Sequence, residues 1–315
     1  MRWSTEPSVV ALGGGHGLAA SLTALRGVTT DLTAVVTVAD NGGSSGRLRD
    51  EFGVLPPGDL RMALAALCGD DRWGQTWARV LQHRFASAGE MDGHSLGNLL
   101  IVTLWELLDD HVDGLDWVAG LLGARGRVLP MALTPLDITA EVRGAGTDPD
   151  EVSTVRGQVE VATTPGEVLS VSLVPADAGA CPEALEAIAE ADWVVIGPGS
   201  WYSSVIPHLL VPDLRDALCS TSGRVAVSMN LEPHADETRG YDVADHLDVL
   251  LAHAPDLRID TVLVDSTAVR DGDRLRDRVA AAGAHLELTD LASSFPGVHD
   301  PQKLASAYAR LLTAN

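Results

Sequence analysis

The amino-acid sequence predicts an α/β fold, namely a Rossmann-like, doubly wound and mostly parallel sheet with a helical insertion and a β-rich segment. Residues 8–12 (SVVAL) form a short apolar run that leads into GGGHG and then into the helical pattern LAASLTALRG. Residues 32–38 (LTAVVTV) form a second apolar run. Strand, glycine turn, helix and strand within about 30 residues are typical of a βαβ unit of a parallel sheet.

The remaining elements follow in order along the chain. Residues 59–124 contain apolar runs at helical spacing, which we interpret as a helical insertion packed on the sheet edge. Residues 127–176 include QVEVAT and VLSVSLV, whose alternation predicts a β-rich segment. Strand and helix patterns then alternate from residue 182 to the C-terminus. Because no low-complexity linker interrupts them, we expect residues 1–315 to form a single domain.

Charge limits the classes of partner. The chain has 22 basic and 44 acidic residues, a formal net charge of −22, which repels nucleic acid and anionic lipid. Lys303 is the only lysine, so no glycine loop is followed by the lysine that a P-loop requires. We therefore expect no nucleic-acid partner, and we expect arginine to supply positive charge at any anion site.

Cysteine usage and hydropathy predict the compartment. Cys68, Cys181 and Cys219 are widely spaced and form no C-x-x-C pair, which favours free thiols in a reducing environment. The N-terminal residues lack the apolar run of a signal peptide, and no apolar stretch of 18 residues occurs elsewhere. The expected location is cytoplasmic, without membrane insertion.

The first glycine-rich loop follows the first predicted strand and consists of Gly13, Gly14, Gly15, His16 and Gly17. Glycines at such a turn permit close backbone approach, and the helix N-terminus offers N–H groups and partial positive charge to a phosphate. A tight turn before a helix would also use glycine, so this loop by itself leaves both interpretations open.

The second loop follows the second predicted strand, and it contains Asp40, Asn41, Gly42, Gly43, Ser44, Ser45 and Arg49. In a dinucleotide enzyme, an acid at the position of Asp40 would bind ribose hydroxyls. The glycines, serines and arginines that follow are instead typical of an anion-binding loop. A flexible surface loop is the alternative.

Further polar loops are expected at the same sheet edge, and their candidate residues are Gly58, Asp59, Arg61, His94, Ser95, Asn98, Gly197, Pro198, Gly199, Ser200 and Asn230. Asp59 could be a helix N-cap or, together with Asp40, a ligand of Mg²⁺. Open α/β sheets bind ligands at the carboxyl ends of their strands, so these loops predict a nucleotide or phosphate site.

Other features favour structural roles. Trp77, Trp105 and Trp117 fall in apolar helices and are predicted to lie in the core. His246 and His253 lie seven residues apart on a predicted helix that also carries aspartates, and we interpret them as part of a solvated helix face rather than a metal site.

The loops, in this order, closely resemble those of the YvcK-type gluconeogenesis factor family, which is related to the CofD-type 2-phospho-L-lactate transferases. The matching stretches are GGGHGL (13–18), VTVADNGGSSGRLRDEF (36–52), PPGDLRMALAAL (56–67), GHSLGNLL (93–100), RGRVLP (125–130) and IGPGSWYSSVIPHLLVP (196–212), with a weaker echo in MNLEPHADETRGY.

The resemblance implies a Rossmann-like core, a UDP-sugar ligand such as UDP-N-acetylglucosamine, and a regulatory role that links carbon metabolism to cell shape and cell-wall synthesis. The family pattern places the ligand against residues 13–17, 40–46, 58–59, 93–98 and 197–200. We expect the protein to form a homo-oligomer, namely a dimer, and to interact with a regulatory protein partner. The transferase relatives move 2-phospho-L-lactate from a guanosine nucleotide onto a deazaflavin with Mg²⁺, so a transferase of this type stays open as an alternative.

Two departures from the family pattern bear on that choice. The pattern usually reads A-D-D-G-G, whereas this chain has Asn41 at the second acid, which weakens a metal-dependent role. His16 stands where threonine is commoner. No catalytic residue is assigned. An NAD-dependent dehydrogenase is suggested only by the spacing of residues 15–20 and by Asp40.

Overall fold

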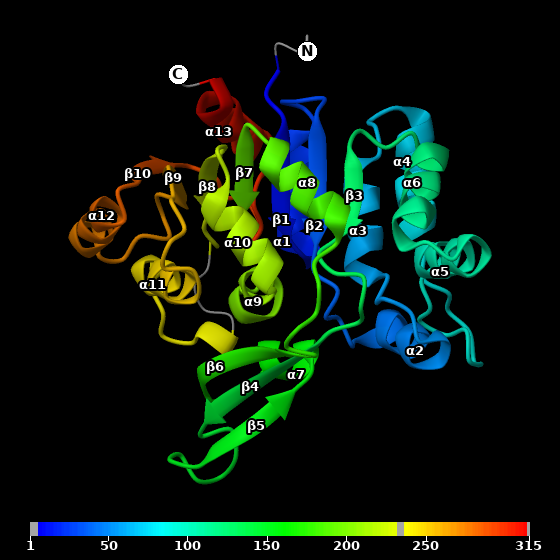
Figure 1. Ribbon diagram of the computed structural model, residues 1–315, viewed down its shortest axis with the longest axis horizontal. Coiled ribbons are helices and arrows are strands. Elements are labelled where there is room, and N and C mark those ends of the chain that lie inside the picture. The colour runs from blue at the N-terminus through cyan, green and yellow to red at the C-terminus, as the bar shows by residue number, and fades with distance from the viewer. Residues whose placement is uncertain (1–5, 232–235, 314–315) are drawn as a thin grey trace.

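The computed structural model describes residues 6–231 and 236–313 of the 315-residue chain. At its centre lies a seven-stranded sheet with the order β10-β9-β8-β7-β1-β2-β3 (Figure 1). Its strands are β1 Val9–Gly13, β2 Leu32–Val36, β3 Arg127–Pro130, β7 Trp193–Ile196, β8 Arg224–Ser228, β9 Thr261–Asp265 and β10 His285–Thr289. All neighbouring strands in this sheet pair in parallel. The predicted α/β class with a parallel, Rossmann-like sheet is confirmed.

Strand β1 lies inside the sheet, with β2 and β3 on one side of it and β7 to β10 on the other. Its residue Val9 pairs with Leu32 of β2 on one side and with Trp193 of β7 on the other. Every residue of β1 is buried, as expected for a parallel strand that is covered on both faces. The strand order therefore reverses between β1 and β7, and in open α/β sheets such a switch point is where ligands bind.

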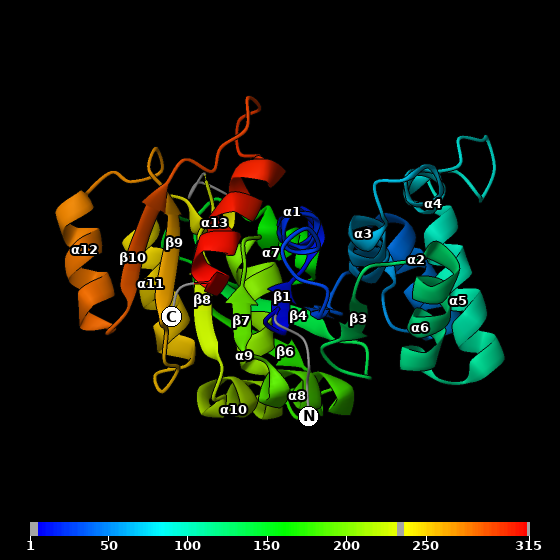
Figure 2. The same cartoon turned by 90° about the horizontal axis from the view of Figure 1, so that it is seen from above.

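Helices cover both faces of the sheet (Figure 2). On one face, α1 Gly15–Leu25 packs against α13 Pro301–Thr313. On the opposite face, α8 Pro182–Glu190 packs against α10 Pro212–Ser220. The remaining helices in the C-terminal half of the chain are η1 Trp201–Val205 (a π-helix), α9 Pro207–Leu210, η2 Asp236–Thr238 (a 3₁₀ helix), α11 Val243–His253 and α12 Gly272–Ala281. None of the helices described combines the length and apolar character needed to cross a bilayer.

A helical group lies beside the edge strand β3, and two of its helices contact that strand (Figure 1). Its members are α2 Gly43–Phe52, α3 Gly58–Leu67, α4 Arg72–Gln82, α5 Leu96–Leu108 and α6 His111–Leu122. Trp105 is buried as predicted, but Trp117 is 66% exposed, so its assignment to the core is wrong. An apolar sequence run on a helix does not reveal which of its faces meets the protein, and Trp117 lies on the outer face of α6.

A second, antiparallel sheet projects beyond the carboxyl ends of the parallel strands (Figure 1). Its strands are β4 Asp137–Arg143, β5 Val152–Arg156 and β6 Glu167–Val174, with β4 in the middle. One expectation for this segment is wrong, because the run QVEVAT contains the short helix α7 Gln158–Ala162 rather than a strand. Likewise, helix α2 begins within the glycine-rich stretch after β2, where a loop was expected.

Candidate functional site

The glycine loop after β1 brings the backbone of two neighbouring strand ends into contact. Gly15 has a φ of +57°, in the left-handed region that favours glycine. A Cβ atom at Gly17 would lie 2.3 Å from the backbone oxygen of Pro198, and a Cβ atom at Gly14 would lie 2.5 Å from Oδ2 of Asp59. Glycine is therefore required at both positions by the close approach of other residues.

The loop after β7 faces the first loop across this contact. Gly199 donates its N–H to Oδ1 of Asn230 at 2.9 Å, and Nδ2 of Asn230 donates to the Gly199 oxygen at 2.8 Å. Asn230, at the end of β8, thus fixes the backbone of this loop. Residues 232–235, part of the weaker family echo, lie outside the described residues.

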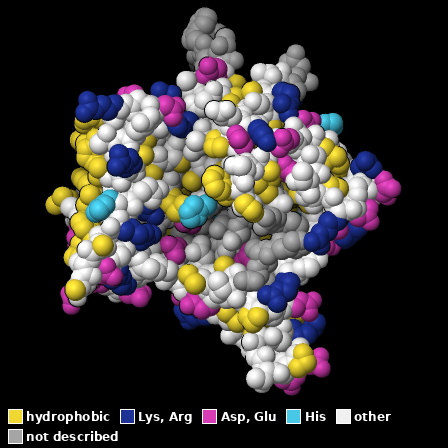
Figure 3. All heavy atoms as spheres, turned by 180° about the vertical axis from the view of Figure 1, so that it is seen from behind, with side chains coloured by type: hydrophobic (Ala, Val, Ile, Leu, Met, Phe, Trp, Pro, Cys, Tyr) yellow, Lys and Arg dark blue, Asp and Glu magenta, His cyan; other side chains and the backbone are white. Residues whose placement is uncertain are grey.

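A cleft of about 340 Å³ lies between these loops and helix α7. The molecule is hollowed between the body of the parallel sheet and the projecting small sheet (Figure 3). The residues that line the cleft are Gly14, Gly15, His16, Gly17, Asp59, Gln158, Val159, Ala162, Thr163, Gly199, Ser200, Ser203 and Ser204. Sequence reasoning found the two glycine loops and Asp59. It missed the four residues of and next to α7, because their alternating pattern indicated a strand. Ser203 and Ser204 fall in the stretch 196–212 that carries the family resemblance, although they are not among the candidate site residues.

Asp59 is the carboxylate of the cleft. Burial and the neighbouring charge of Asp40 raise the pKa of Asp59 to about 7, although hydrogen bonds from the Gly15 N–H and from Gln158 oppose the increase. Its Oδ2 atom is buried and has no hydrogen-bond partner among the described residues. A carboxyl group with this pKa can accept a hydrogen bond when ionised and donate one when protonated.

Asp40 lies next to Asp59 and shares its environment. Its pKa is also raised, by burial, against hydrogen bonds from Gly42 and Ser45. The Gly42 N–H donates to Oδ1 of Asp40 at 2.8 Å, and a Cβ atom at Gly58 would lie 2.7 Å from Oδ2. Glycine backbone thus leaves room for the Asp40 carboxylate beside Asp59, and neighbouring groups with perturbed pKa values are typical of functional sites.

The predicted arginines lie behind the cleft rather than along it. Arg61 is 3% exposed, and its Nε donates to Oδ1 of Asn98 at 2.8 Å. Burial and the nearby Arg84 lower the pKa of Arg61 to about 10. Arg49 bonds to the Leu136 oxygen at 2.9 Å and to Asp137 at 2.6 Å, and so links α2 to the start of β4.

A polar cluster surrounds Ser44 at the N-terminal turn of α2. The Ser44 hydroxyl accepts from the Ser95 N–H and from Nδ2 of Asn98, both at 3.1 Å, and lies 3.2 Å from Nδ1 of His94. Burial and Arg47 lower the pKa of His94. Because the hydroxyl already accepts two hydrogen bonds, its own proton is available for Nδ1 of His94 whenever that nitrogen is unprotonated.

The rest of the second loop holds neighbouring segments in place. The Ser45 hydroxyl accepts from the Gly58 N–H at 3.0 Å. Gly43 adopts a φ of +47° where α2 begins, and Asn41 contacts α7. The predicted site residues therefore form two groups, one along the cleft that includes Asp59 and one behind it, with Asp40 and Gly58 between them.

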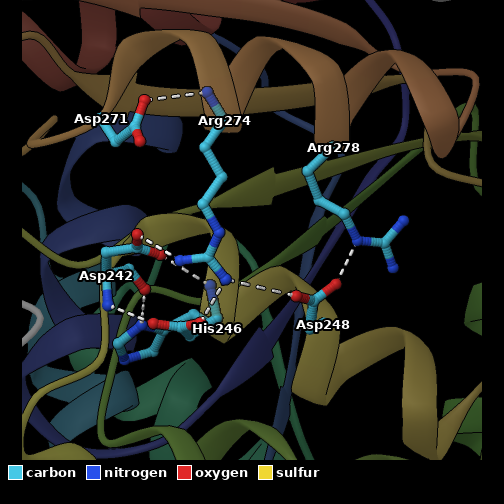
Figure 4. A network of polar contacts seen from close by, with 7 residues as sticks. Asp242, His246, Asp248, Asp271, Arg274 and Arg278 are labelled. Carbon is cyan, nitrogen blue, oxygen red and sulfur yellow. Dashed lines mark hydrogen bonds and ion pairs between the residues drawn. The ribbon is translucent and has the colours of Figure 1, made fainter.

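The aspartates and histidine of α11 form a different kind of group. Arg274 of α12 binds Asp242 and Asp245, both at 2.5 Å (Figure 4). His246 is 2% exposed and packs edge-on against Trp201, so its assignment to a solvated face is wrong. Within residues 6–231 and 236–313, no group of three or more metal-ligating side chains occurs.

Comparisons with known proteins identify the family. A family model described as 2-phospho-L-lactate transferase CofD matches residues 9–297. A Mycobacterium tuberculosis protein, whose name refers to a gluconeogenesis factor, is 50% identical over 95% of this chain and 88% of its own length. The gluconeogenesis factor of Listeria monocytogenes is 37% identical over 85% of this chain and 80% of its own length. A crystal structure of a UPF0052 family member from Bacillus halodurans has a TM-score of 0.85 and 32% identity, and the match covers 96% of this chain and 99% of that one. The chain therefore belongs to the CofD family, and its relatives there are the gluconeogenesis factors of the YvcK type.

Proposed function

We propose that this protein binds a nucleotide-sugar of the UDP-N-acetylglucosamine kind in the cleft between β1 and β7, and that it acts as a regulator linking gluconeogenic carbon metabolism to cell shape and cell-wall synthesis. The observation that carries the proposal is the contact of two glycine loops at the switch point of the sheet. There, the Cβ atom that any other residue would add at Gly14 or Gly17 meets neighbouring atoms at 2.5 and 2.3 Å.

The residues around the cleft support a ligand with both phosphate and sugar groups. Helix α1 begins at Gly15 without a side-chain cap, and N–H groups at such a helix end are suited to phosphate. Asp59, Ser200, Ser203 and Ser204 offer partners for sugar hydroxyls. A volume of about 340 Å³ lies within the range of ligand pockets.

The lining of the cleft also changes the expected source of positive charge. It includes His16 but neither arginine nor lysine. Phosphate binding would therefore depend on backbone N–H groups, on His16 and on any cation that the ligand brings. Two neighbouring carboxylates suit Mg²⁺, which is commonly held by one or two carboxylates together with substrate phosphates. One of them has an oxygen without a hydrogen-bond partner among the described residues.

Titration calorimetry tests this proposal directly. UDP-N-acetylglucosamine, UDP-glucose and GDP would each be titrated into the protein with and without Mg²⁺. We expect binding heat with the acetylated UDP-sugar and weaker or no heat with GDP. At about 100 times its dissociation constant, a ligand should add about 2.7 kcal/mol to the free energy of unfolding, which a thermal scan detects. Absence of heat with every nucleotide would exclude the proposal.

A transferase of the CofD type is the second candidate, and the match of the CofD family model over residues 9–297 favours it. Asp40 and Asp59 would hold Mg²⁺ at the diphosphate of the donor, which would neutralise charge during transfer. Incubation of the protein with a deazaflavin and phospholactate joined to guanosine through a diphosphate, with Mg²⁺ or with EDTA, tests it. Formation of the phospholactyl product only with Mg²⁺ would support this function over a purely regulatory one.

A homodimer and a regulatory protein partner remain part of the proposal. Trp73 and Trp117 in the helical group are 54% and 66% exposed, and exposed apolar surface is common at protein interfaces. Light scattering on the eluted peak of a sizing column measures the mass, which for one chain is 33.0 kDa. A mass of one chain at all concentrations would contradict the dimer.

A further inference from the structure

Helix α7 forms one wall of the cleft although it belongs to the small sheet. It spans Gln158–Ala162 and contacts both β4 and η1. A helix of five residues is not stable by itself, because it has too few internal hydrogen bonds to offset the cost of nucleation. The position of this wall must therefore be set by contacts with the rest of the molecule.

Asn41, from the loop after β2, makes two such contacts at the start of α7. Its Oδ1 accepts the Val159 N–H at 3.2 Å, and its Nδ2 donates to Oε2 of Glu160 at 2.9 Å. One side chain thus acts as acceptor for the backbone of α7 and as donor to a carboxylate on the same helix. An amide side chain can do both at once while remaining uncharged, whereas a carboxylate can only accept.

Glycines on both sides make room for this contact. A Cβ atom at Gly157 would lie 2.0 Å from Oε2 of Glu160 and 2.3 Å from Nδ2 of Asn41. Gly157 also has a φ of +111°, which other residues rarely adopt. On the opposite side, a Cβ atom at Gly42 would lie 2.9 Å from a methyl carbon of Val159. The two segments are built to approach each other at this point.

Gln158, the first residue of α7, connects the position of this helix to the cleft. Its Nε2 donates to the Ser203 oxygen at 3.3 Å, and its side chain also hydrogen-bonds Asp59. A shift of α7 would therefore move a hydrogen-bond donor away from the buried carboxylate and from η1.

We propose that Asn41 is a positioning residue, a neutral clamp that holds α7 as a wall of the cleft, rather than a residue that binds the ligand itself. Its effect on ligand affinity rests on the proposed function, whereas its effect on α7 does not. An aspartate at this position would lose the donor and place a second carboxylate against Glu160.

Hydrogen exchange in the ligand-free protein tests the clamp, with the amides of Val161 and Thr163 as reporters. They donate to the Gly157 and Val159 oxygens, both at 3.0 Å, and so open when α7 loosens. We expect Asn41→Asp to raise their exchange rates about fivefold to tenfold, because like charges in contact repel and the donor is lost. Adding Glu160→Gln should return the rates to within about twofold of the wild type, since the Gln amide can donate to the new carboxylate.

A matched control separates this pairing from a general change of charge. Glu141→Gln on β4 removes one negative charge from the same small sheet, at a residue that accepts a hydrogen bond from Thr154 of β5. It should leave Asn41→Asp unrescued. In about 1 M salt the excess exchange caused by Asn41→Asp should shrink, whereas a packing defect would not respond. Equal rescue by Glu141→Gln, or no change in α7 exchange with Asn41→Asp, would overturn the clamp.

A second variant keeps the proposal testable if Asn41→Asp does not fold. Glu160→Ala, at an exposed position, removes only the acceptor of the Asn41 amide and should raise exchange of α7 about twofold to threefold. Unchanged exchange in Glu160→Ala would equally contradict the clamp. Calorimetry with UDP-N-acetylglucosamine then shows whether affinity falls with the loosening of α7. No heat with wild-type protein would exclude the proposed function, while the exchange results would still decide the clamp.

Discussion

Two groups of aspartates in this molecule differ in how their charge is satisfied. On α11, Asp242 and Asp245 cap the helix reciprocally, at 2.9 and 2.8 Å, and both bind Arg274 (Figure 4). Burial alone would raise the pKa of Asp245, but the hydrogen bond from Arg274 and the capping contacts outweigh it and lower that pKa. The Asp245 carboxylate is thus stabilised as an anion by the fold itself, and Asp242 has an arginine and a backbone N–H as partners.

The cleft pair has the opposite character. Burial raises the pKa of both Asp40 and Asp59, their mutual repulsion raises that of Asp59 further, and Oδ2 of Asp59 has no hydrogen-bond partner among the described residues. A fold retains such groups at a cost to its stability, because buried polar atoms without partners are unfavourable. The comparison teaches that the deficit of partners, rather than the number of acids, distinguishes a candidate site from a structural network.

The largest expected effect is that of Gly17→Ala, which disrupts the contact between the two glycine loops beside the cleft. The new Cβ atom would lie 2.3 Å from the Pro198 oxygen and 2.7 Å from the Gly199 Cα atom, and backbone cannot move aside as a side chain can. We expect a loss of about 3 kcal/mol in the free energy of unfolding and no measurable binding of UDP-N-acetylglucosamine. Urea denaturation and calorimetry measure the two effects.

Gly120→Ala is the matched control, because Gly120 is also a helical glycine but a Cβ atom added there would meet no other atom within 4 Å. It should raise stability by about 0.5–1 kcal/mol and leave binding unchanged. If the two alanine variants behaved alike, the close contact of the glycine loops would not be what the cleft requires.

Asp59→Asn should stabilise the protein above neutral pH while it abolishes ligand binding. The folded-state pKa of about 7 lies above the ordinary value of 3.8, so the folded protein binds this proton more tightly than the unfolded chain does. The free energy of unfolding of the wild type therefore falls as the pH rises from about 4 to about 7. Removing the charge should recover about 1–3 kcal/mol at pH 8.

Chemical denaturation between about pH 4 and about pH 8 measures this change in slope. Glu237, whose pKa burial also raises to about 7, titrates in the same window, so a smaller slope should remain in Asp59→Asn. Glu237→Gln in addition should flatten it further. A slope that is unchanged by Asp59→Asn would show that Asp59 is ionised at little cost and would remove the basis of the comparison.

Asp242→Ala tests the structural side of the comparison. It removes the N-cap of α11 and one of the Arg274 contacts, so we expect a loss of about 1 kcal/mol at pH 7. Ligand affinity should not change. A change in affinity comparable to that of Asp59→Asn would mean that the α11 network takes part in the site.

Much of the fold could be predicted because parallel strands buried on both faces have a strong local signature. SVVAL and WVVI are short apolar runs that are each followed directly by glycine. In the structure they form the neighbouring strands β1 and β7. The short helix α7 could not be predicted, because its residues alternate as a strand would and its stability comes from Asn41 and η1. Tertiary contacts there outweigh local pattern.

The candidate site was predictable where backbone geometry requires a residue type, and less so elsewhere. The glycines within residues 13–17 and 197–199 could be found because close approach or positive φ restricts their positions to glycine. The roles of the arginines could not be predicted, because guanidinium groups serve equally in phosphate sites and in structural ion pairs. Arg49 binds Asp137, and that partner lies 88 residues away along the chain.

The smallest expected effect is that of Arg276→Ala. Arg276 and Arg274 both lie on α12 and carry the same charge, so a comparison of the two shows what the fixed position of the Arg274 partners contributes. Arg276 pairs with Asp273 one turn earlier at 2.6 Å, but their side chains are 61% and 94% exposed. Water and salt screen such a pair, so we expect a change of less than about 0.5 kcal/mol in the free energy of unfolding. Arg274 differs because its two aspartates are also the caps of α11 and are themselves fixed by backbone hydrogen bonds. Arg274→Ala should therefore lower the melting temperature more than Arg276→Ala does. Equal effects would indicate that the network acts only through the count of opposite charges.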